Sequence, residues 1–307
     1  MRDVDDQKDP SDLTDEFIKL FRAAAPERSQ ELDTLLEGVS NLVLRGGDQV
    51  GFVMESNSWF IRFSQRSLEA VWVLATSGAQ AVELYSGAIW AAQVGMLDLS
   101  ELESADPSEA TYVKALRSNV NNAIDCLNSP DALHCKPIRP LNSGNLFEVL
   151  ADDCVQLAVA FVFLHELKHR IKDQEETAEL EERRADEFAL DWLLGAARTY
   201  AKESGHEVGK VVAKRGMGIA LAMFVIASLS PLKGSTGDPH PSPLDRLRRL
   251  LDLVKETVPE QTSFWIIAAA VIFGVLRVKG LPINVDAKGV THQDLATRLL
   301  DALAEVA

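Results

Sequence analysis

The stretch FVFLHELKHRIKD, at Phe161–Asp173, constrains the fold of this chain more than any other feature. It joins an apolar run to a charged one and holds His165, Glu166 and His169 in the order HExxH. Positions i and i+4 of a helix lie one turn apart on the same face, so a helix here offers two ring nitrogens to one ion. Glu166 can then accept a proton from a metal-activated water. A catalytic zinc ion takes three protein ligands, and this motif supplies two of them.

The third ligand is predicted on the next helix, which contains ERRADEFALDWLL at Glu182–Leu194. A short turn, which we place just after Gln174, makes the two helices antiparallel, so residues that face each other have a constant number sum. That register sets Glu182 opposite the gap between the two histidines, with Asp186 one turn further along the same face. We expect Asp186 to accept the second ring N–H of a ligand histidine and to fix its orientation. Glu179 and Asp186 are the next candidates for the third ligand.

Apolar residues at helical spacing, interrupted by proline, glycine and capping residues, predict a mainly α (α+β) chain. The expected helices cover Asp12–Ala24, Gln30–Leu44, Leu68–Val94, Pro107–Leu127 with Asp106 as N-cap, Asn145–Lys172, Glu175–Tyr200, Val208–Leu229, Leu244–Val258, Ser263–Val278 and His292–Ala304. Short β-branched and aromatic pieces around Gly46-Gly47-Asp48 predict a β-hairpin or small antiparallel sheet across residues 41–64.

The composition is that of a globular protein, with 47% hydrophobic and 25% charged residues. We expect residues 1–12 to be a disordered acidic tail that is not a signal peptide, and residues 13–307 to be a single domain. Within it, residues 13–140 would hold the first helices and the hairpin, and residues 141–307 the catalytic helical part. The net charge of −15 and the scattered basic residues predict no nucleic-acid partner.

Cysteines and apolar runs bear on the cellular location. Cys126, Cys135 and Cys154 are odd in number and form no CxxC pair, which indicates a reducing, cytoplasmic compartment without a disulfide framework. Apolar runs of fewer than the ~18 residues that span a membrane are predicted to be buried core helices. The runs are Cys154–Leu164, Ile219–Leu229 and Phe264–Leu276. No membrane partner is expected, and a membrane-associated peptidase using residues 216–232 is the alternative.

HELKH followed by ERRADEFALDWLL resembles the gluzincin zinc metallopeptidases, whose signature is HExxH followed by ExxxD or ExxA on the next active-site helix. DPHPSPLDR, at Asp238–Arg246, resembles the His-Pro-x-x-x-x-Arg element of the HtpX and CAAX-prenyl-protease type. The short motif spacing, the chain length and the lack of clear membrane spans are more similar to the phage-exclusion Lit-type peptidases. The close match covers about Val155–Ala197 and Pro239–Arg246.

This resemblance implies an active-site helix hairpin with a small antiparallel β-element, one Zn²⁺ per chain, and cleavage of an intracellular protein. The matching positions are His165, His169 and Glu182 for the metal ligands, Glu166 for the general base and Asp186 for the acid behind a ligand. His240 would stabilise the oxyanion, or simply pack between its prolines. Arg246 is expected to hold its loop through an ion pair to Asp186 or Glu182. The Lit-type likeness adds a role in bacterial defence or stress, and an activating or inhibiting protein partner.

Two further alternatives stay open. The chain also resembles the ImmA/IrrE-type regulatory peptidases, although the His240-Pro241 element argues against them. It could instead be a non-catalytic helical scaffold with a structural or vestigial metal site, closed by a fourth protein ligand. The remaining histidines are not expected to bind a metal. We expect His134, next to Cys135, to lie in an ordinary loop, and His206 and His292 to lie on the surface. The strand region at residues 50–63 is the candidate for binding substrate in extended form.

Overall fold

The computed structural model describes residues 14–38, 44–47, 49–56, 61–129, 135, 145–171, 177–229, 232–233, 241–260 and 262–306. The expected acidic tail, most of the His134–Pro140 loop and His240 lie outside these residues. The described chain is mainly helical, which confirms the predicted fold class. The α-helices are α1 (Thr14–Ala24), α2 (Ser29–Gly38), α3 (Gln65–Gln93), α4 (Leu102–Ala105), α5 (Glu109–Asn128), α6 (Asn145–Arg170), α7 (Ala178–Leu194), α8 (Ala197–Glu203), α9 (Val208–Leu229), α10 (Pro243–Thr257), α11 (Phe264–Lys279) and α12 (His292–Val306).

A small sheet lies beside the helices and is mixed rather than purely antiparallel. Its strands β1 (Leu44–Gly47), β2 (Met54–Ser56) and β3 (Ile61–Ser64) are ordered β1-β3-β2. The pairing of β2 with β3 is antiparallel, as expected, but β1 pairs with β3 in parallel. The predicted helix to Leu44 is also wrong at its end, because α2 stops at Gly38 and Leu44 opens β1.

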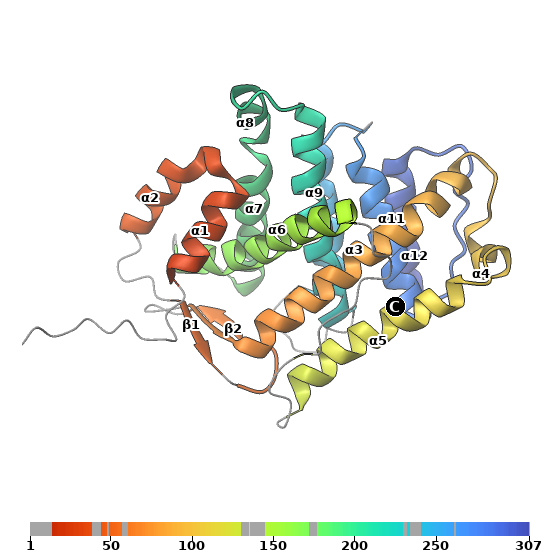
Figure 1. The fold of residues 1–307 in the computed structure, drawn as a ribbon, viewed down its shortest axis with the longest axis horizontal. Helices are drawn as coiled ribbons and strands as arrows, with labels where there is room; N and C mark the ends of the chain where they lie inside the picture. The colour runs from red at the N-terminus through yellow and green to blue at the C-terminus, as the bar shows by residue number, and fades with distance from the viewer. Residues whose placement is uncertain are drawn as a thin grey trace, which may run out of the picture.

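The long helix α6 crosses the middle of the molecule, with α1 and α2 at one end and α11 and α12 at the other (Figure 1). It packs against α3, α7 and α9. On the α9 side Gly218 permits the close approach, because an added Cβ there would collide with Leu157 of α6. Three aromatic rings, Phe17 of α1, Phe63 of β3 and Phe163 of α6, have centroids 3.9–5.4 Å apart. This cluster fixes the sheet and α1 against the part of α6 that carries His165.

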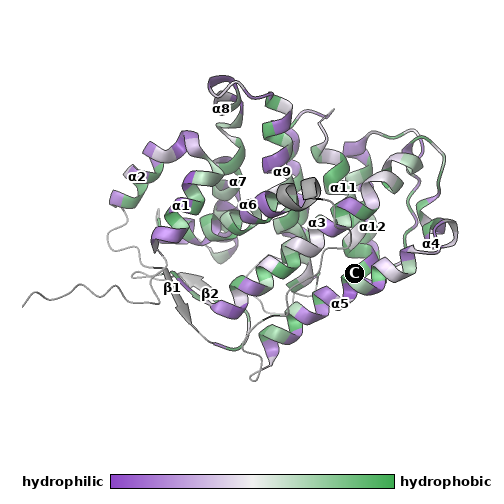
Figure 2. Cartoon of the chain, in the orientation of Figure 1, coloured by the Kyte–Doolittle hydropathy of each residue, from purple (hydrophilic) through white to green (hydrophobic). Residues whose placement is uncertain are grey.

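The three apolar runs lie in α6, α9 and α11, and most of their residues are buried. Figure 2 shows hydrophilic and hydrophobic residues in alternating blocks along α2 and α5, as on helices with one buried face. Among the described residues, Val208–Leu229 has the length and apolar composition that could cross a membrane, and most of its most apolar stretch is buried inside the protein. A core helix has the same properties, so this feature is weak evidence for a membrane span.

Two predicted helix boundaries are wrong for local reasons. Asp106 does not cap α5: its carboxylate accepts the backbone N–H of Ser108 at 2.9 Å, and the helix begins at Glu109. Asp side chains favour such local turns over regular helix. The helix expected over Glu175–Tyr200 is divided into α7 and α8 by a turn at Gly195 and Ala196.

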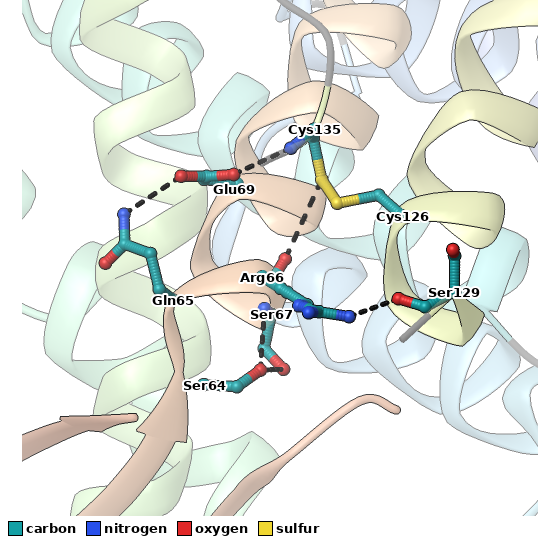
Figure 3. Close-up of a disulfide and its surroundings, with 8 residues drawn as sticks. All are labelled: Ser64, Gln65, Arg66, Ser67, Glu69, Cys126, Ser129 and Cys135. Carbon is teal, nitrogen blue, oxygen red and sulfur yellow. Dashed lines mark hydrogen bonds between the residues drawn. A yellow bond between two sulfur atoms is a disulfide. The ribbon is translucent and has the colours of Figure 1, made fainter. Parts of the chain in front are cut away.

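The prediction that the cysteines form no disulfide is also wrong. Cys126, in the last turn of α5, is bonded to Cys135 (Figure 3). Cys154 is free and buried. Cysteine spacing in the sequence missed this pair because its partners come from the end of a helix and a separate loop residue. The bond joins α5 to the chain that enters α6 ten residues later, at Asn145.

Candidate metal centre

Two histidines near the end of α6 point their ring nitrogens at the same place. The Nε2 atoms of His165 and His169 lie 3.2 Å apart. Glu182 of α7 faces both rings, with Oε2 at 3.2 Å from Nε2 of His165 and Oε1 at 3.5 Å from Nε2 of His169. His165 and Glu182 are buried, and His169 is half-buried. Three donor groups from two antiparallel helices therefore converge on one point.

The start of α7 sets this register. Thr177 is the N-cap, and its hydroxyl accepts the backbone N–H of Leu180 at 3.3 Å. Ser, Thr, Asp and Asn are the residues that satisfy the free N–H groups at a helix start. One helical turn further along, Ala185 is fully buried between Glu182 and Asp186. Its small side chain lets α7 approach α6 closely enough for the carboxylates to reach the imidazoles.

The other ring nitrogen of each histidine is held by a second carboxylate. Nδ1 of His165 lies 2.9 Å from Oδ1 of Asp186, and Nδ1 of His169 lies 3.1 Å from Oε1 of Glu181. An ionised carboxylate only accepts hydrogen bonds, so both Nδ1 atoms carry the hydrogen. In the neutral rings the two Nε2 atoms then present lone pairs to each other at 3.2 Å. This arrangement is repulsive unless a cation lies between them.

The spacing of the donors fits a small tetrahedral cation. Zinc binds nitrogen and oxygen ligands at roughly 2.0–2.2 Å, which places tetrahedral ligands roughly 3.3–3.6 Å from one another. The two Nε2 atoms lie 3.2 Å apart, and the carboxylate of Glu182 brings Oε2 to 3.2 Å from the ring of His165 and Oε1 to 3.5 Å from the ring of His169. Among the described residues, this group of nearby His, Cys, Asp and Glu donors has three members. The residues could thus hold a metal ion with one coordination position left for another ligand.

Asp186 is itself held from the far side by Arg246 of α10. The guanidinium donates from Nη2 to Oδ1 at 2.6 Å and from Nε to Oδ2 at 3.0 Å. Its Nη1 also lies 4.0 Å from Oε2 of Glu182. Such a two-bond arginine–carboxylate pair is strong and directional. Ser242, which caps α10 and accepts the N–H of Asp245, sets the start of the helix that carries Arg246.

The charges of the metal-free site are strongly coupled. Burial lowers the pKa of His165, but its hydrogen bonds to Asp186 and Glu182 outweigh burial and raise the pKa to about 9. Burial raises the pKa of Glu182, but the contact with His165 outweighs it and lowers the pKa to about 2. Burial and the neighbouring charge of His165 lower the pKa of His169. Without a metal, one proton shared around His165 therefore supplies the missing positive charge.

Glu166 follows His165 on α6 and is half-buried. Burial opposes the charged form of Arg246, but the carboxylates of Asp186, Glu182 and Glu166 outweigh burial and raise the pKa of this guanidinium. Glu166 is thus close enough to the cluster to contribute to its field.

The structure brings together five of the seven predicted site residues in direct contact: His165, His169, Glu182, Asp186 and Arg246. His240 and His134 lie outside the described residues. His206 is exposed, as expected, whereas His292 is half-buried, where burial lowers its pKa.

Glu181 is the contact that the sequence analysis missed. Its position next to Glu182 in an acidic run suggested a solvated side chain, and its side chain is 36% exposed. The helix-pair register could have found it, since the residue number that pairs with His169 is 180, one position away.

Comparison with known families gives the class of the protein. The sequence model of the Peptidase U49 family matches residues 61–268, about two thirds of the chain. The chain therefore belongs to the Peptidase U49 family, a family of peptidases. The match runs from the first residue of β3 into α11 and includes every site residue described above. No curated protein and no solved structure matches the chain.

Proposed function

We propose that this peptidase is a zinc-dependent endopeptidase of the HExxH type, with one Zn²⁺ per chain. The observation that carries the proposal is the convergence of Nε2 of His165, Nε2 of His169 and the carboxylate of Glu182, whose neighbouring atoms lie 3.2–3.5 Å apart. The gluzincin resemblance assigns the same three residues as ligands. Asp186 and Glu181 hold the rings so that the ligand atoms face inward.

In this proposal the residues of α6 perform both binding and proton transfer. A bound zinc ion would polarise the scissile carbonyl and increase the acidity of the attacking water. Glu166 acts as the general base: it accepts a proton from the water and then donates it to the leaving amine. Arg246, which neutralises Asp186, keeps that carboxylate ionised and aligned behind His165. His240 is proposed to stabilise the developing oxyanion.

Two features favour a catalytic centre over a structural one. A structural zinc site is closed by four protein ligands, and the described donor group has three members. In addition, β2 occupies an edge of the sheet and contacts α6. An edge strand has free backbone groups on one side, so it can add an extended peptide as a further strand. We therefore propose that a protein substrate binds in extended form along this edge.

The likeness to the phage-exclusion Lit-type peptidases supports a proposal about the cellular role of the enzyme. It suggests a cytoplasmic enzyme of bacterial defence or stress that cleaves an intracellular protein and is activated or inhibited by a protein partner. The ImmA/IrrE-type regulatory peptidases are the second candidate, and the ExxAxxFA reading at Glu182–Ala189 favours them.

Metal content measured by mass spectrometry is the direct test. We expect about one zinc ion per purified wild-type chain and loss of that ion in His165→Ala. His206→Ala, which removes an exposed histidine away from the centre, is the matched control and should retain the metal. A wild-type chain that stays free of metal after incubation with zinc at neutral pH would overturn the proposal and favour a scaffold.

A further inference from the structure

The Cys126–Cys135 pair lies away from the metal centre and has no part in the proposed catalysis. Three elements meet there: the last turn of α5, the first turns of α3, and the single residue Cys135 from the chain between α5 and α6 (Figure 3). The pair closes a loop of nine residues in sequence separation. The entropic cost of bringing two chain positions together is smaller for a short loop than for a long one.

The two cysteine residues differ in exposure. Cys126 is buried, with 3% of its surface exposed, whereas Cys135 is only partly buried. Thiol–disulfide exchange begins with a thiolate that approaches one sulfur directly, so the accessible sulfur is the one attacked. Attack is therefore expected at Cys135, with Cys126 as the leaving group.

The surroundings hold Cys135 in place independently of the bond. Oε2 of Glu69 accepts the backbone N–H of Cys135 at 2.8 Å, and Gln65 donates to the other oxygen of the same carboxylate at 3.1 Å. Sγ of Cys135 lies 3.9 Å from the carbonyl oxygen of Arg66, a suitable acceptor for a free thiol. The reduced form of Cys135 thus has partners already positioned for its backbone N–H and its thiol.

The third cysteine provides an internal contrast. Cys154 on α6 is fully buried, and burial raises the pKa of its thiol to about 12. A buried, protonated thiol is inert towards oxidants and alkylating reagents. Thiol chemistry in the native protein is therefore confined to the Cys126–Cys135 pair.

We propose that Cys135 is a modification site for low-molecular-weight thiols and disulfides, and that Cys126 is its resolving partner. An incoming thiol loses its proton and bonds to Sγ of Cys135, while Sγ of Cys126 leaves with the electron pair of the old bond and takes up a proton. A second small-molecule thiol then attacks the small-molecule sulfur of the mixed disulfide. Cys135 leaves in its reduced form, and a small-molecule disulfide is released. In the reverse direction, the small-molecule disulfide is reduced to two thiols and the pair is oxidised. Two electrons move in either direction.

The state of this site decides whether α5 is covalently joined to Cys135. In the oxidised form the disulfide joins them, and in the reduced form the hydrogen bonds of Cys135 remain. A disulfide that closes a short loop mainly restricts the unfolded chain. Reduction of the full-length protein is therefore expected to lower its melting temperature by roughly 5 °C.

The test is a redox titration of the full-length chain in buffers of reduced and oxidised glutathione. Samples are quenched by alkylation and each cysteine is quantified by peptide mass spectrometry. We expect Cys126 and Cys135 to change together between reduced and oxidised states, with Cys154 unlabelled until the protein is denatured. In Cys126→Ala, Cys135 should form a mixed disulfide with glutathione, and this reaction should be at least about tenfold faster than that of Cys126 in Cys135→Ala, because only Cys135 is accessible.

Several results would overturn the assignment. A pair that stays oxidised throughout the titration is a purely structural bond, and a pair that never oxidises is two independent thiols. Equal labelling of the remaining cysteine in the two alanine variants would contradict the roles of attacked and resolving sulfur. Glu69, Cys126 and Cys135 also form a group of possible metal ligands, so a reduced pair that resists alkylation and retains zinc would replace a modification site with a metal site. The wild-type titration gives an answer even where a variant fails to fold.

Discussion

Two buried clusters in this molecule have nearly the same construction and very different surroundings. In the first, Arg246 holds Asp186 through two hydrogen bonds, and Asp186 contacts His165. In the second, Arg277 holds Glu109 through bonds of 2.5 and 2.7 Å, and Glu109 accepts the hydroxyl of Tyr85 at 3.3 Å. The arginine side chain is 20% exposed in both clusters, so burial does not distinguish them.

The difference lies in the group at the far end. In the second cluster Tyr85 uses its one hydrogen, and burial together with the charge of Glu109 raises its pKa. This cluster joins α3, α5 and α11. In the first cluster His165 uses Nδ1 to contact Asp186, and its second ring nitrogen, Nε2, faces His169 and Glu182. The carboxylate–arginine pair therefore has a structural role in both clusters. Only in the first cluster does the pair also orient an imidazole, that of His165, towards the proposed metal centre.

The largest expected effect concerns the residue next to that imidazole. Glu166→Gln preserves the size of the side chain and all three proposed ligands but removes the base. We expect a normal zinc content and a loss of peptidase activity of about 10²- to 10⁴-fold, the usual contribution of a general base. The measurement pairs metal analysis with cleavage of a protein substrate. Glu109→Gln is the control from the second cluster, and normal cleavage by Glu166→Gln would remove the base from the mechanism.

The two clusters can be compared directly by neutralising each carboxylate. Asp186→Asn and Glu109→Gln both remove the closest charged partner of an arginine, so each should cost up to about 3–5 kcal/mol of folding stability. Only Asp186→Asn should weaken zinc binding, by about 10- to 100-fold, because it disturbs the orientation of a ligand imidazole. Zinc affinity is measured by competition with a chelator, well below the melting temperature of both variants. Equal zinc affinity in the two variants would mean that the first cluster is structural as well.

The helices around the site could be predicted because the local signals agree with one another. The apolar run before His165 and the spacing of His165 and His169 predicted the site helix, and the antiparallel register selected Glu182. The start of α7 lies at Thr177–Ala178, close to the expected turn, so the register holds. Long helices with strong periodicity are determined locally, and tertiary contacts change their ends more than their existence.

The remaining features depend on contacts between distant segments. The parallel pairing of β1 with β3 joins Leu44 to Ile61 and is invisible to local alternation. The bond between Cys126 and Cys135 depends on where α5 ends and on how Glu69 of α3 holds Cys135. Glu181 was missed for a different reason, since an acidic residue in a charge-rich run already has a local explanation as a solvated side chain.

Glu181 supports His169 as Asp186 supports His165, so its substitution should also lower zinc affinity, but by less. Its carboxylate contacts Nδ1 of His169 at 3.1 Å but is 36% exposed, so water can replace part of its role. We expect Glu181→Ala to lower zinc affinity by about tenfold, at the lower end of the effect of such supporting groups. Glu181→Gln keeps a hydrogen-bond acceptor and should recover most of the affinity. Chelator competition with both variants separates the effect of the His169 ring orientation from that of the Glu181 charge. An unchanged zinc affinity in Glu181→Ala would show that His169 needs no support.

The smallest expected effect is a pH dependence of the metal-free protein. Burial lowers the pKa of His165, but its contacts with Asp186 and Glu182 raise it from 6.5 to about 9. A group whose pKa is raised by folding contributes stability that is complete below its unfolded pKa and is lost as pH rises through the folded value. Chelator-treated protein should therefore melt at progressively lower temperature between about pH 6.5 and about pH 9. Zinc takes the place of the proton, so the zinc-loaded protein should lose this dependence, and so should Glu109→Gln when loaded with zinc. A flat profile in the metal-free protein would mean that no shared proton joins His165 to its carboxylates, and the contrast between the imidazole and Tyr85 would then rest on geometry alone.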